Sequence, residues 1–463
     1  MVSFKDSQTS LNSAIEFGEL AIIGRHFKHG KGEDFEEITA PESMQSIVIE
    51  KDKQLTIGRS ESNSLIIDHT AVSSVHCRVW AIQFDENSIP LVYIKDTSLN
   101  GTFVNKEKIS KNQTYLLNHG DVITIKFGVS LKFLSVLGAD ELSYGRSLIQ
   151  TDKIQTQFAK WVVKERVLGN GTFGNVFVCQ QSATKKLCAV KIIKSTADSV
   201  SFESKVLSKL SHPNIIKVYE SHIINSRLYI FEDLICGGDL FSYLADGDAL
   251  TSIPEFESLI ITFQISQALE YLHSQNIAHR DLKLDNILLE APQPFTRIVL
   301  ADFGIARTVS DSREKRRMFT TVGTPEYCAP EVGFEYSKTP HHLRAKLFKN
   351  PPVNPGYDTK CDIWSLGVIS HIMLSGISPF YGDGDEFSIV RNAKLGRLQL
   401  HSKQWDGVSD NAKDFIQCLL YVDIEKRYDV GKCLQHPWIK KHEVELKKTY
   451  LKILSESCFS IQE

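Results

Sequence analysis

The 463-residue sequence has little of several features that mark specialised classes of protein. Its nine cysteines include no C-x-x-C pair, which argues against a zinc site or a disulfide scaffold and suits reduced thiols. No apolar run is long enough to span a membrane, and the first residues match neither a signal peptide nor a myristoylation site. The net charge of −3 gives no general attraction for nucleic acid. We therefore expect a soluble intracellular protein of two or three domains.

What the chain does contain is the run H-R-D-L-K-L-D-N at 279–286, followed by D-F-G at 302–304. In-line phosphoryl transfer from ATP needs a carboxylate beside the acceptor hydroxyl, a lysine near the moving group, and Mg²⁺ held by an amide oxygen and a second carboxylate. Residues that could supply these groups are, in order, Asp281, Lys283, Asn286 and Asp302. The two motifs resemble the protein kinase family. The resemblance implies ATP and Mg²⁺ as cofactors, the first two residues as catalytic and the last two as metal ligands.

A Gly-rich segment upstream predicts where the ATP phosphates bind. The bare backbone of G-N-G-T-F-G-N-V at 169–176 can lie close over phosphates, although the pattern alone also marks dinucleotide-binding folds. Cys188-Ala189-Val190-Lys191 resembles the third strand of a kinase small lobe, and Glu203 fits the helical partner of Lys191. The predicted ATP-binding residues are Leu168, Gly169, Asn170, Gly171, Thr172, Phe173, Gly174, Val176, Ala189, Lys191 and Glu203.

Later landmarks resemble the large lobe of a kinase. Ala329-Pro330-Glu331 matches the end of an activation segment, 362–367 the start of a buried helix, and Arg427 the partner of the glutamate. Residues 252–255 have the spacing of a capping box and predict a helix start there.

The first part of the chain predicts a different module. Strand-like alternation recurs at 46–49, 55–57, 91–94 and 122–125, with turn residues between, which favours an antiparallel sandwich.

Three short motifs in this module resemble the forkhead-associated (FHA) domain, which binds phosphothreonine peptides. They are Gly58-Arg59-Ser60, Ser73-Ser74-Val75-His76 and Asn100-Gly101-Thr102. Arg59 can fork onto phosphate oxygens, Ser73 can donate a hydroxyl, and Asn100 can fix the peptide backbone. By analogy with the family His76 is structural. Leu99 departs from the pattern, because many relatives carry a hydroxyl or small residue there.

We therefore predict an α+β chain in which an FHA β-sandwich precedes a bilobal kinase domain with a β-rich small lobe and an α-rich large lobe. The predicted bounds are 16–137 for the FHA domain, 138–160 for a polar linker, 161–438 for the kinase domain and 439–463 for a tail. Residues 334–356 are predicted as a surface insertion. The tail is either an extra helix or an autoinhibitory segment.

An FHA domain ahead of a serine/threonine kinase resembles the checkpoint effector kinases, which are recruited to phosphorylated adaptors after DNA breaks. Three blocks, at 234–244, 324–334 and 377–384, resemble the fungal meiosis-specific member. This resemblance implies a nuclear, chromosome-associated protein, with a mitotic damage kinase as the alternative. A pseudokinase adaptor is a further alternative, but it predicts loss of Lys191, Asp281, Asn286 or Asp302, and all four are present.

Two features of the sequence concern specificity. Asp239 matches the acidic position that basophilic kinases use for an arginine three residues before the phosphorylated hydroxyl, and capping of the next helix is the alternative. Counting back from Gly237-Gly238 without a gap places Glu232 at the gatekeeper position of the adenine pocket. A one-residue insertion would place Phe231 there instead.

The activation segment offers a site for self-phosphorylation. Arg317 lies three residues before Thr320, so Thr320 satisfies the preference predicted above. We expect phosphorylation between molecules that gather on a scaffold, with Thr324 as a weaker regulatory candidate. The expected partners are a phosphothreonine adaptor, protein substrates and a second copy of the chain.

Overall fold

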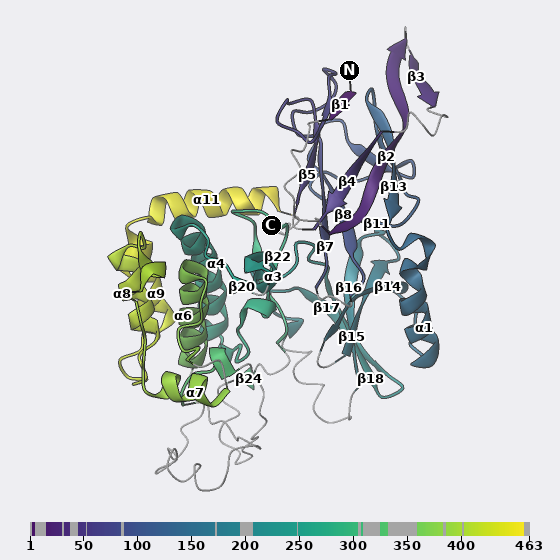
Figure 1. The fold of residues 1–463 in the computed structure, drawn as a ribbon. Coiled ribbons are helices and arrows are strands. Elements are labelled where there is room, and N and C mark those ends of the chain that lie inside the picture. The colour runs from purple at the N-terminus through teal and green to yellow at the C-terminus, as the bar shows by residue number, and fades with distance from the viewer. Residues whose placement is uncertain are drawn as a thin grey trace. The chain divides into compact units, whose positions relative to one another are not determined.

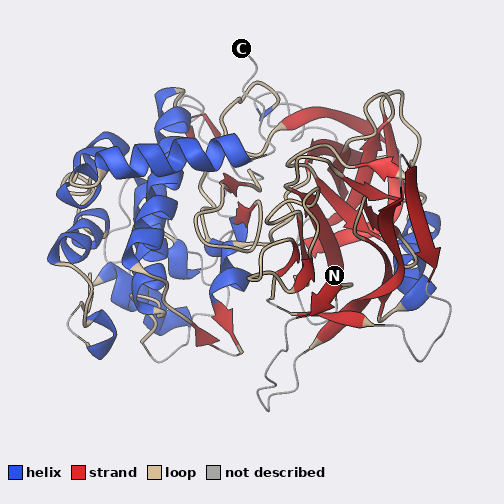
Figure 2. Ribbon diagram, turned by 90° about the horizontal axis from the view of Figure 1, so that it is seen from above, coloured by secondary structure: helices blue, strands red, loops and turns tan. Residues whose placement is uncertain are grey.

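The computed structural model describes residues 2–4, 15–29, 32–37, 45–51, 53–84, 88–171, 174–194, 207–247, 249–303, 307–308, 325–331, 359–382, 386–400 and 402–457. The chain divides into two compact units (Figure 1). The first comprises Met1–Val200, Val218–Gly238 and Glu456–Glu463, and the second Ser201–Lys217 and Asp239–Ser455. Strands dominate the first unit and helices the second (Figure 2). Among the described residues, no helix combines the length and apolar character needed to cross a membrane.

The N-terminal part of the first unit is a sandwich of two sheets, as predicted. One sheet has the order β1 (Val2–Phe4), β6 (Leu65–Ile67), β5 (Leu55–Gly58), β7 (Cys77–Ile82), β8 (Leu91–Asp96) and β11 (Thr114–Leu117). The other has the order β10 (Glu107–Lys108), β9 (Thr102–Val104), β12 (Val122–Ile125), β13 (Val129–Ser135), β2 (Glu16–His29) and β3 (Gly32–Glu37), with β4 (Ser46–Glu50) paired to β2. The strand pairs are antiparallel except for β5 with β6.

Alternating apolar residues build the core of the sandwich. In β12, Ile123 and Ile125 are buried while Val122 and Thr124 are partly exposed, as a strand with one face on the core requires. Inward-facing residues of both sheets form one cluster, which includes Leu20, Ile22, Ile57, Val79, Val92, Ile94, Leu117, Leu131 and Phe133.

The rest of the first unit is an antiparallel sheet, the small lobe of the predicted kinase. Its strand order is β14 (Trp161–Gly171), β15 (Gly174–Gln181), β16 (Leu187–Lys194), β18 (Arg227–Asp233) and β17 (Val218–Ile224). One face carries a second core cluster that includes Trp161, Phe177, Val190, Ile192, Tyr229 and Phe231.

The segment 138–160 was predicted as a polar linker, but part of it forms regular secondary structure. It contains a 3-10 turn (Gly138–Leu142) and helix α1 (Ser143–Thr151). A Cβ atom on Gly145 would lie only 1.7 Å from the carbonyl oxygen of Glu165, so the helix packs directly on β14. Arg146 pairs with the Glu165 carboxylate at 2.8 Å, and Ile154 is buried in the small-lobe core. The segment is thus part of the small lobe.

Helices make up most of the second unit. They are α3 (Leu240–Leu244), α4 (Glu255–Ser274), α6 (Lys360–Ser375), α7 (Glu386–Lys394), α8 (Asp410–Leu419), α9 (Val430–Gln435), α10 (Pro437–Lys440) and α11 (Glu443–Glu456). Short strands accompany them, namely β19 (Ala245–Asp246), β20 (Ala249–Leu250), β21 (Ile277–Ala278), β22 (Ile287–Leu289), β23 (Ile298–Leu300) and β24 (Arg307–Thr308). From Cys361 to Ser375 every residue of α6 is buried, so the predicted buried helix is present.

Helix α4 begins where it was expected, but the predicted capping box does not form. Its N-cap is Pro254, and no side chain caps the first turn. The Glu255 carboxylate instead accepts hydrogen bonds from the Ser409 hydroxyl at 2.6 Å and the Trp438 indole N–H at 2.8 Å. The Glu255 side chain is therefore engaged by tertiary partners and not by a local cap.

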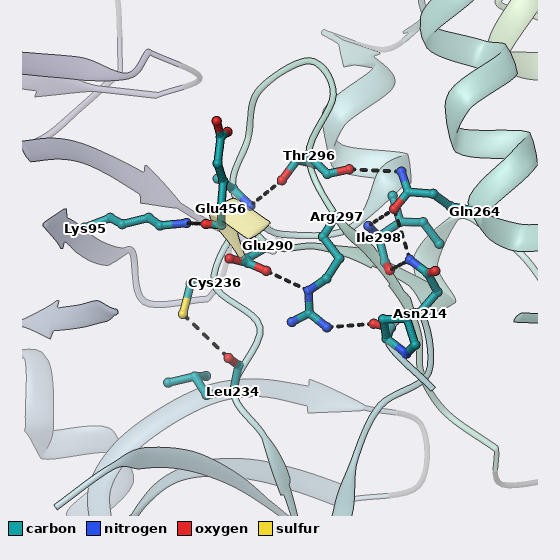
Figure 3. A network of polar contacts seen from close by, with 12 residues as sticks. Lys95, Asn214, Leu234, Cys236, Gln264, Glu290, Thr296, Arg297, Ile298 and Glu456 are labelled. Atoms are coloured by element: carbon teal, nitrogen blue, oxygen red, sulfur yellow. Dashed lines mark hydrogen bonds and ion pairs between the residues drawn. The ribbon is translucent and has the colours of Figure 1, made fainter. Parts of the chain in front are cut away.

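The described part of the tail is an extra helix that packs on the second unit. Leu446 and Ile453 of α11 are buried, and the Tyr450 hydroxyl donates to Asn214 Oδ1 at 2.5 Å. Asn214 Nδ2 donates in turn to Gln264 Oε1 at 3.0 Å and to the carbonyl oxygen of Ile298 at 2.8 Å (Figure 3). The helix thus joins a buried polar network in the large lobe.

Candidate functional site

One buried aspartate fixes the start of the predicted catalytic loop. The carboxylate of Asp362, in the first turn of α6, accepts hydrogen bonds from the backbone N–H groups of His279 and Arg280, both at 2.9 Å. His273 Nε2 lies 2.9 Å from the same carboxylate. Burial acts to raise the pKa of Asp362, but the hydrogen bonds and the neighbouring histidines outweigh it and lower that pKa. Asp362 therefore serves as a buried anion that anchors the loop.

His279 connects this loop to the segment that follows β23. Its Nδ1 accepts the N–H of Asp281 at 3.4 Å, and its Nε2 lies 3.0 Å from the Ala301 carbonyl oxygen. Its ring packs on Phe303, with ring centroids 4.5 Å apart. The N–H of Ala301 donates to the carbonyl oxygen of Asn286 at 2.9 Å. The two predicted motifs are thus brought together by hydrogen bonds.

The carboxylate of Asp281 lies among the groups predicted to act with it. Asn286 Nδ2 donates to the Asp281 carbonyl oxygen at 2.7 Å and to its Oδ2 at 3.1 Å, and Lys283 Nζ lies 4.0 Å from Oδ2. Because both Asn286 bonds use the amide nitrogen, the amide oxygen is the atom available to a cation. Partial burial raises the pKa of Asp281; Lys283 and His279 oppose the rise and Asp302 adds to it.

Two residues of this assembly have a strained backbone. Arg280 has φ 69° and Asp302 has φ 59°, in the left-handed region that side chains other than glycine rarely adopt. Such conformations persist where surrounding bonds enforce them, and they concentrate at functional sites. Here the bond to Asp362 holds Arg280, and Asp302 directly follows the anchored Ala301.

The predicted pair between Glu331 and Arg427 is present. Arg427 is fully buried and binds both carboxylate oxygens of Glu331, at 2.7 and 2.9 Å. Its guanidinium also lies 5.0 Å from the centre of the Trp364 ring. A buried arginine with a bidentate partner keeps a precise geometry, so this pair fixes the end of the activation segment to α6.

In the first unit, several predicted ATP-binding residues share one face of the small-lobe sheet. The register places Lys191 opposite Val176 on one side and Ile230 on the other, and Ala189 opposite Glu232. Residues directly opposed on neighbouring antiparallel strands point to the same face. Since the other face carries the core cluster, Val176, Ala189 and Lys191 lie on the face left for a ligand.

The same register bears on the gatekeeper alternatives. Glu232 lies on the face of Ala189 and Lys191. Phe231 is fully buried on the opposite face and stacks on Trp161, with ring centroids 5.1 Å apart. The structure therefore favours the ungapped count, with Glu232 as the gatekeeper.

Strands β14 and β15 bring the two ends of the Gly-rich segment together. Gly169 pairs with Val176, and Gly171 with Gly174. A Cβ atom on Gly174 would lie 2.0 Å from the carbonyl oxygen of Ile192, so a larger residue there would displace the strand. Several predicted residues lie outside the described part of the chain, namely Thr172, Phe173, Glu203, Gly304, Thr320, Thr324 and the insertion 334–356.

Loops of the sandwich meet at the predicted phosphopeptide site. The backbone N–H of Arg59, just after β5, donates to the carbonyl oxygen of Ser73 at 2.9 Å. Ser73 Oγ accepts the N–H of Leu99 at 3.2 Å, and Asn100 Nδ2 donates to the carbonyl oxygen of Ala71 at 2.6 Å. The Arg59 and Asn100 side chains are exposed. The three predicted peptide-binding residues therefore lie on adjoining loops that face solvent.

His76 is buried beneath these loops and contacts two of them. Its Nδ1 accepts the N–H of Ser73 at 3.3 Å, its Nε2 lies 3.3 Å from the carbonyl oxygen of Gly101, and burial lowers its pKa. A Cβ atom on Gly58 would lie 2.5 Å from the carbonyl oxygen of Ser74, which explains the glycine before Arg59.

Asp239 caps a helix and belongs to an acidic group. Its Oδ1 accepts the N–H of Ser242 at 2.7 Å as the N-cap of α3, which is the alternative role weighed above. Burial raises the pKa of Asp239 to about 6, and the Asp285 carboxylate adds to that rise. Asp285 also raises the pKa of Glu326, whose burial contributes more. Sequence reasoning missed Asp285 and Glu326, although Asp285 stands directly before Asn286 in the catalytic motif.

Comparisons with known proteins agree with both modules. The protein kinase domain model matches residues 162–439 and the FHA domain model residues 55–126. The meiosis-specific serine/threonine-protein kinase MEK1 of Saccharomyces cerevisiae is 49% identical over 427 residues, covering 88% of this chain and 85% of its own length. Its Schizosaccharomyces pombe namesake is 36% identical, covering 88% and 86%. A crystal structure of Rad53 residues 1–466 in complex with AMP-PNP is similar with a TM-score of 0.50 and 27% identity, covering 91% of this chain and 100% of that one.

Proposed function

This chain belongs to the protein kinase family as a serine/threonine kinase with an FHA domain, and from that premise we propose that a phosphothreonine-bearing adaptor recruits it during meiotic recombination and double-strand-break checkpoint signalling. The observation that carries the proposal is the coexistence of two built sites in one chain. One is the catalytic loop anchored by Asp362, and the other is the set of FHA loops around Arg59. The similarity to two meiosis-specific kinases supports meiosis over a mitotic damage response and favours a nuclear, chromosome-associated location.

The catalytic residues carry the chemistry of phosphoryl transfer. Asp281 orients the substrate hydroxyl and accepts its proton, and Lys283 screens the charge of the transferring phosphoryl group. The amide oxygen of Asn286 and the carboxylate of Asp302 suit a hard cation, so these residues would hold Mg²⁺, which neutralises phosphate charge when bound. The Rad53 structure with AMP-PNP supports ATP as the donor. Lys191, on the open face of the small-lobe sheet, would contact the α- and β-phosphates.

Replacing Glu232 with glycine should make the enzyme accept ATP analogues enlarged at the adenine. Because Glu232 shares a sheet face with Ala189 and Lys191, its removal opens the adenine side of the site. We expect the variant to label substrates with a bulky thiophosphate donor that the wild type does not use. Phe231→Gly is the matched control and should lose stability instead, since Phe231 is a core residue. If Glu232→Gly does not gain the ability to use the enlarged analogues, the gatekeeper is Phe231 instead.

The labelled substrates should carry arginine three residues before the modified serine or threonine. Asp239 supplies a carboxylate for that arginine, and the interaction with Asp285 supports an extended acidic subsite. Since the pKa of Asp239 is raised to about 6, the group is charged above that pH and neutral below it. The preference for arginine over alanine at this position should therefore weaken as the pH falls from 7.5 to 5.5. Paired peptides assayed for kcat/KM across this range test it, and a preference that does not change with pH contradicts the role of Asp239.

Activation proceeds by phosphorylation of Thr320 between molecules held on one adaptor. Arg317 gives Thr320 the same arginine spacing as the proposed substrates. A phosphate there would pair with the guanidinium of Arg280, whose backbone Asp362 holds within the catalytic loop. Thr324 is the secondary candidate. Two chains on one scaffold reach an effective concentration of about a millimolar, so recruitment itself promotes the reaction.

A further inference from the structure

In the FHA sheet that contains β7 and β8, the outer face is apolar around Trp80 and Tyr93, whereas Arg78 and Lys95 are paired further along the same face. In β7 and β8, Val79 and Val92 point into the sandwich core. Their neighbours Trp80 and Tyr93 point the opposite way, yet they are only 1% and 2% exposed. The register pairs these two residues, and their ring centroids lie 6.2 Å apart. Strands that are apolar on both faces are typical of sheets covered on both sides.

The cover comes from the small lobe and from the hinge, the segment Leu234 to Gly238, which belong to the same compact unit. The indole N–H of Trp80 donates to the carbonyl oxygen of Cys236 at 2.8 Å, across 156 positions of sequence. Ile82, two residues along β7, lies against Gly238, where a Cβ atom would be 3.4 Å from its side chain. Arg166 of β14 is 3% exposed and donates to the carbonyl oxygen of Pro90 at 2.8 Å.

We propose that this face of the FHA domain is the docking surface for the kinase hinge, and that Trp80 is a positioning residue for nucleotide binding. The hinge, Leu234 to Gly238, directly continues β18, whose Glu232 faces the ATP side of the sheet. A backbone segment leaving a strand needs external bonds to keep one conformation. The hydrogen bond from Trp80 is such a constraint. Through it, the FHA domain fixes the backbone conformation at one end of the adenine-binding segment.

The inference rests on the proposed ATP site but uses the FHA domain in a second role. Besides its phosphopeptide loops, the FHA domain provides a packing surface that keeps the hinge in the conformation that binds nucleotide. Trp80 does not touch the nucleotide. It acts through Cys236, so its loss should weaken ATP binding more than it slows the chemical step.

Full-length Trp80→Phe tests this role, because phenylalanine keeps an aromatic ring and removes only the donor and the second ring. We expect KM for ATP to rise about two- to ten-fold, the factor that corresponds to one hydrogen bond, with kcat changed less than about two-fold. Phosphopeptide affinity should stay at the wild-type value, which also reports that the FHA domain is folded. Trp405→Phe is the matched control. Its indole N–H is buried and has no hydrogen-bond partner among the described residues, so KM for ATP should not change.

Hydrogen exchange without nucleotide separates this inference from the proposed function. In Trp80→Phe, and in Ile82→Ala as a second variant, the amides of Leu234 to Gly238 should exchange faster than in the wild type, while those of the catalytic loop should not. This readout does not depend on whether the protein binds ATP. Wild-type hinge exchange in both variants overturns the inference, as does an unchanged KM for ATP in folded Trp80→Phe. Failure of the wild type to bind ATP contradicts the proposed function alone.

Discussion

Replacing Asp281 with asparagine is expected to lower phosphoryl transfer by about 10²- to 10⁴-fold, the range contributed by a positioned general base. Asparagine keeps the shape of the side chain but cannot accept the proton of the substrate hydroxyl. The loop should stay in place, since its anchors are the backbone bonds to Asp362 and the bond between Asn286 and the Asp281 carbonyl oxygen. Nucleotide affinity should therefore remain close to that of the wild type.

Turnover on an arginine-containing peptide, measured together with the affinity for a non-hydrolysable nucleotide, tests this expectation. Asp406→Asn removes an exposed carboxylate elsewhere in the large lobe and should leave both quantities unchanged. Wild-type turnover by Asp281→Asn would contradict the catalytic assignment. A parallel loss of nucleotide binding would show instead that the substitution disturbs the site as a whole.

Replacing Arg59 with alanine is expected to weaken phosphothreonine-peptide binding by at least about ten- to a hundred-fold. Hydrogen bonds to a charged group contribute about 1.5–3 kcal/mol, and the substitution removes the only charged group among the three predicted peptide-binding residues. The guanidinium is ready for this role because its Nε donates to the carbonyl oxygen of Val72 at 3.3 Å, which orients the fork toward solvent. The fold should tolerate the change, since the structural bond to Ser73 comes from the Arg59 backbone.

Titration calorimetry with phosphorylated and unphosphorylated forms of one peptide measures the effect. Lys51→Ala is the matched control, because it removes an exposed positive charge beyond the opposite end of β5. Activity of Arg59→Ala on free peptides should equal that of the wild type. Unchanged affinity for the phosphorylated peptide would refute the FHA assignment, and lost activity on free peptides would refute the separation of the two sites.

Local motifs predicted which residues of the two sites lie together better than they predicted the packing. The catalytic loop and the FHA loops carry short sequence motifs, whereas the pair of Glu331 with Arg427, 96 positions apart, was predicted only from the resemblance to the kinase family. Helix α1 had no such signature, since its main contact is one glycine against the Glu165 backbone. The prediction of a capping box at α4 was wrong for a similar reason, because the Glu255 carboxylate binds Ser409 and Trp438, both more than 150 positions away. Local sequence patterns predict contacts between residues that are close in sequence, whereas the contacts of Gly145 and Glu255 join separate segments of the chain.

The ambiguous positions needed the sheet register and burial. Sequence counting left Glu232 and Phe231 as alternatives, and only the pairing of β16 with β18 placed them on opposite faces. The sequence alone offers no reason to connect Trp80 with the hinge. That assignment required the bond to Cys236.

Phosphorylation of Thr320 on a defined scaffold tests most directly whether FHA recruitment activates the kinase. Full-length wild type is mixed with tagged Asp281→Asn as acceptor, and with peptides carrying either one phosphothreonine or two joined by a flexible linker. Mass spectrometry then measures Thr320 occupancy in the acceptor. We predict strong phosphorylation with the two-site peptide, little with the one-site peptide, and none when either chain carries Arg59→Ala. Equal occupancy with both peptides, or an unmodified Thr320 in the active enzyme, would contradict recruitment-driven activation.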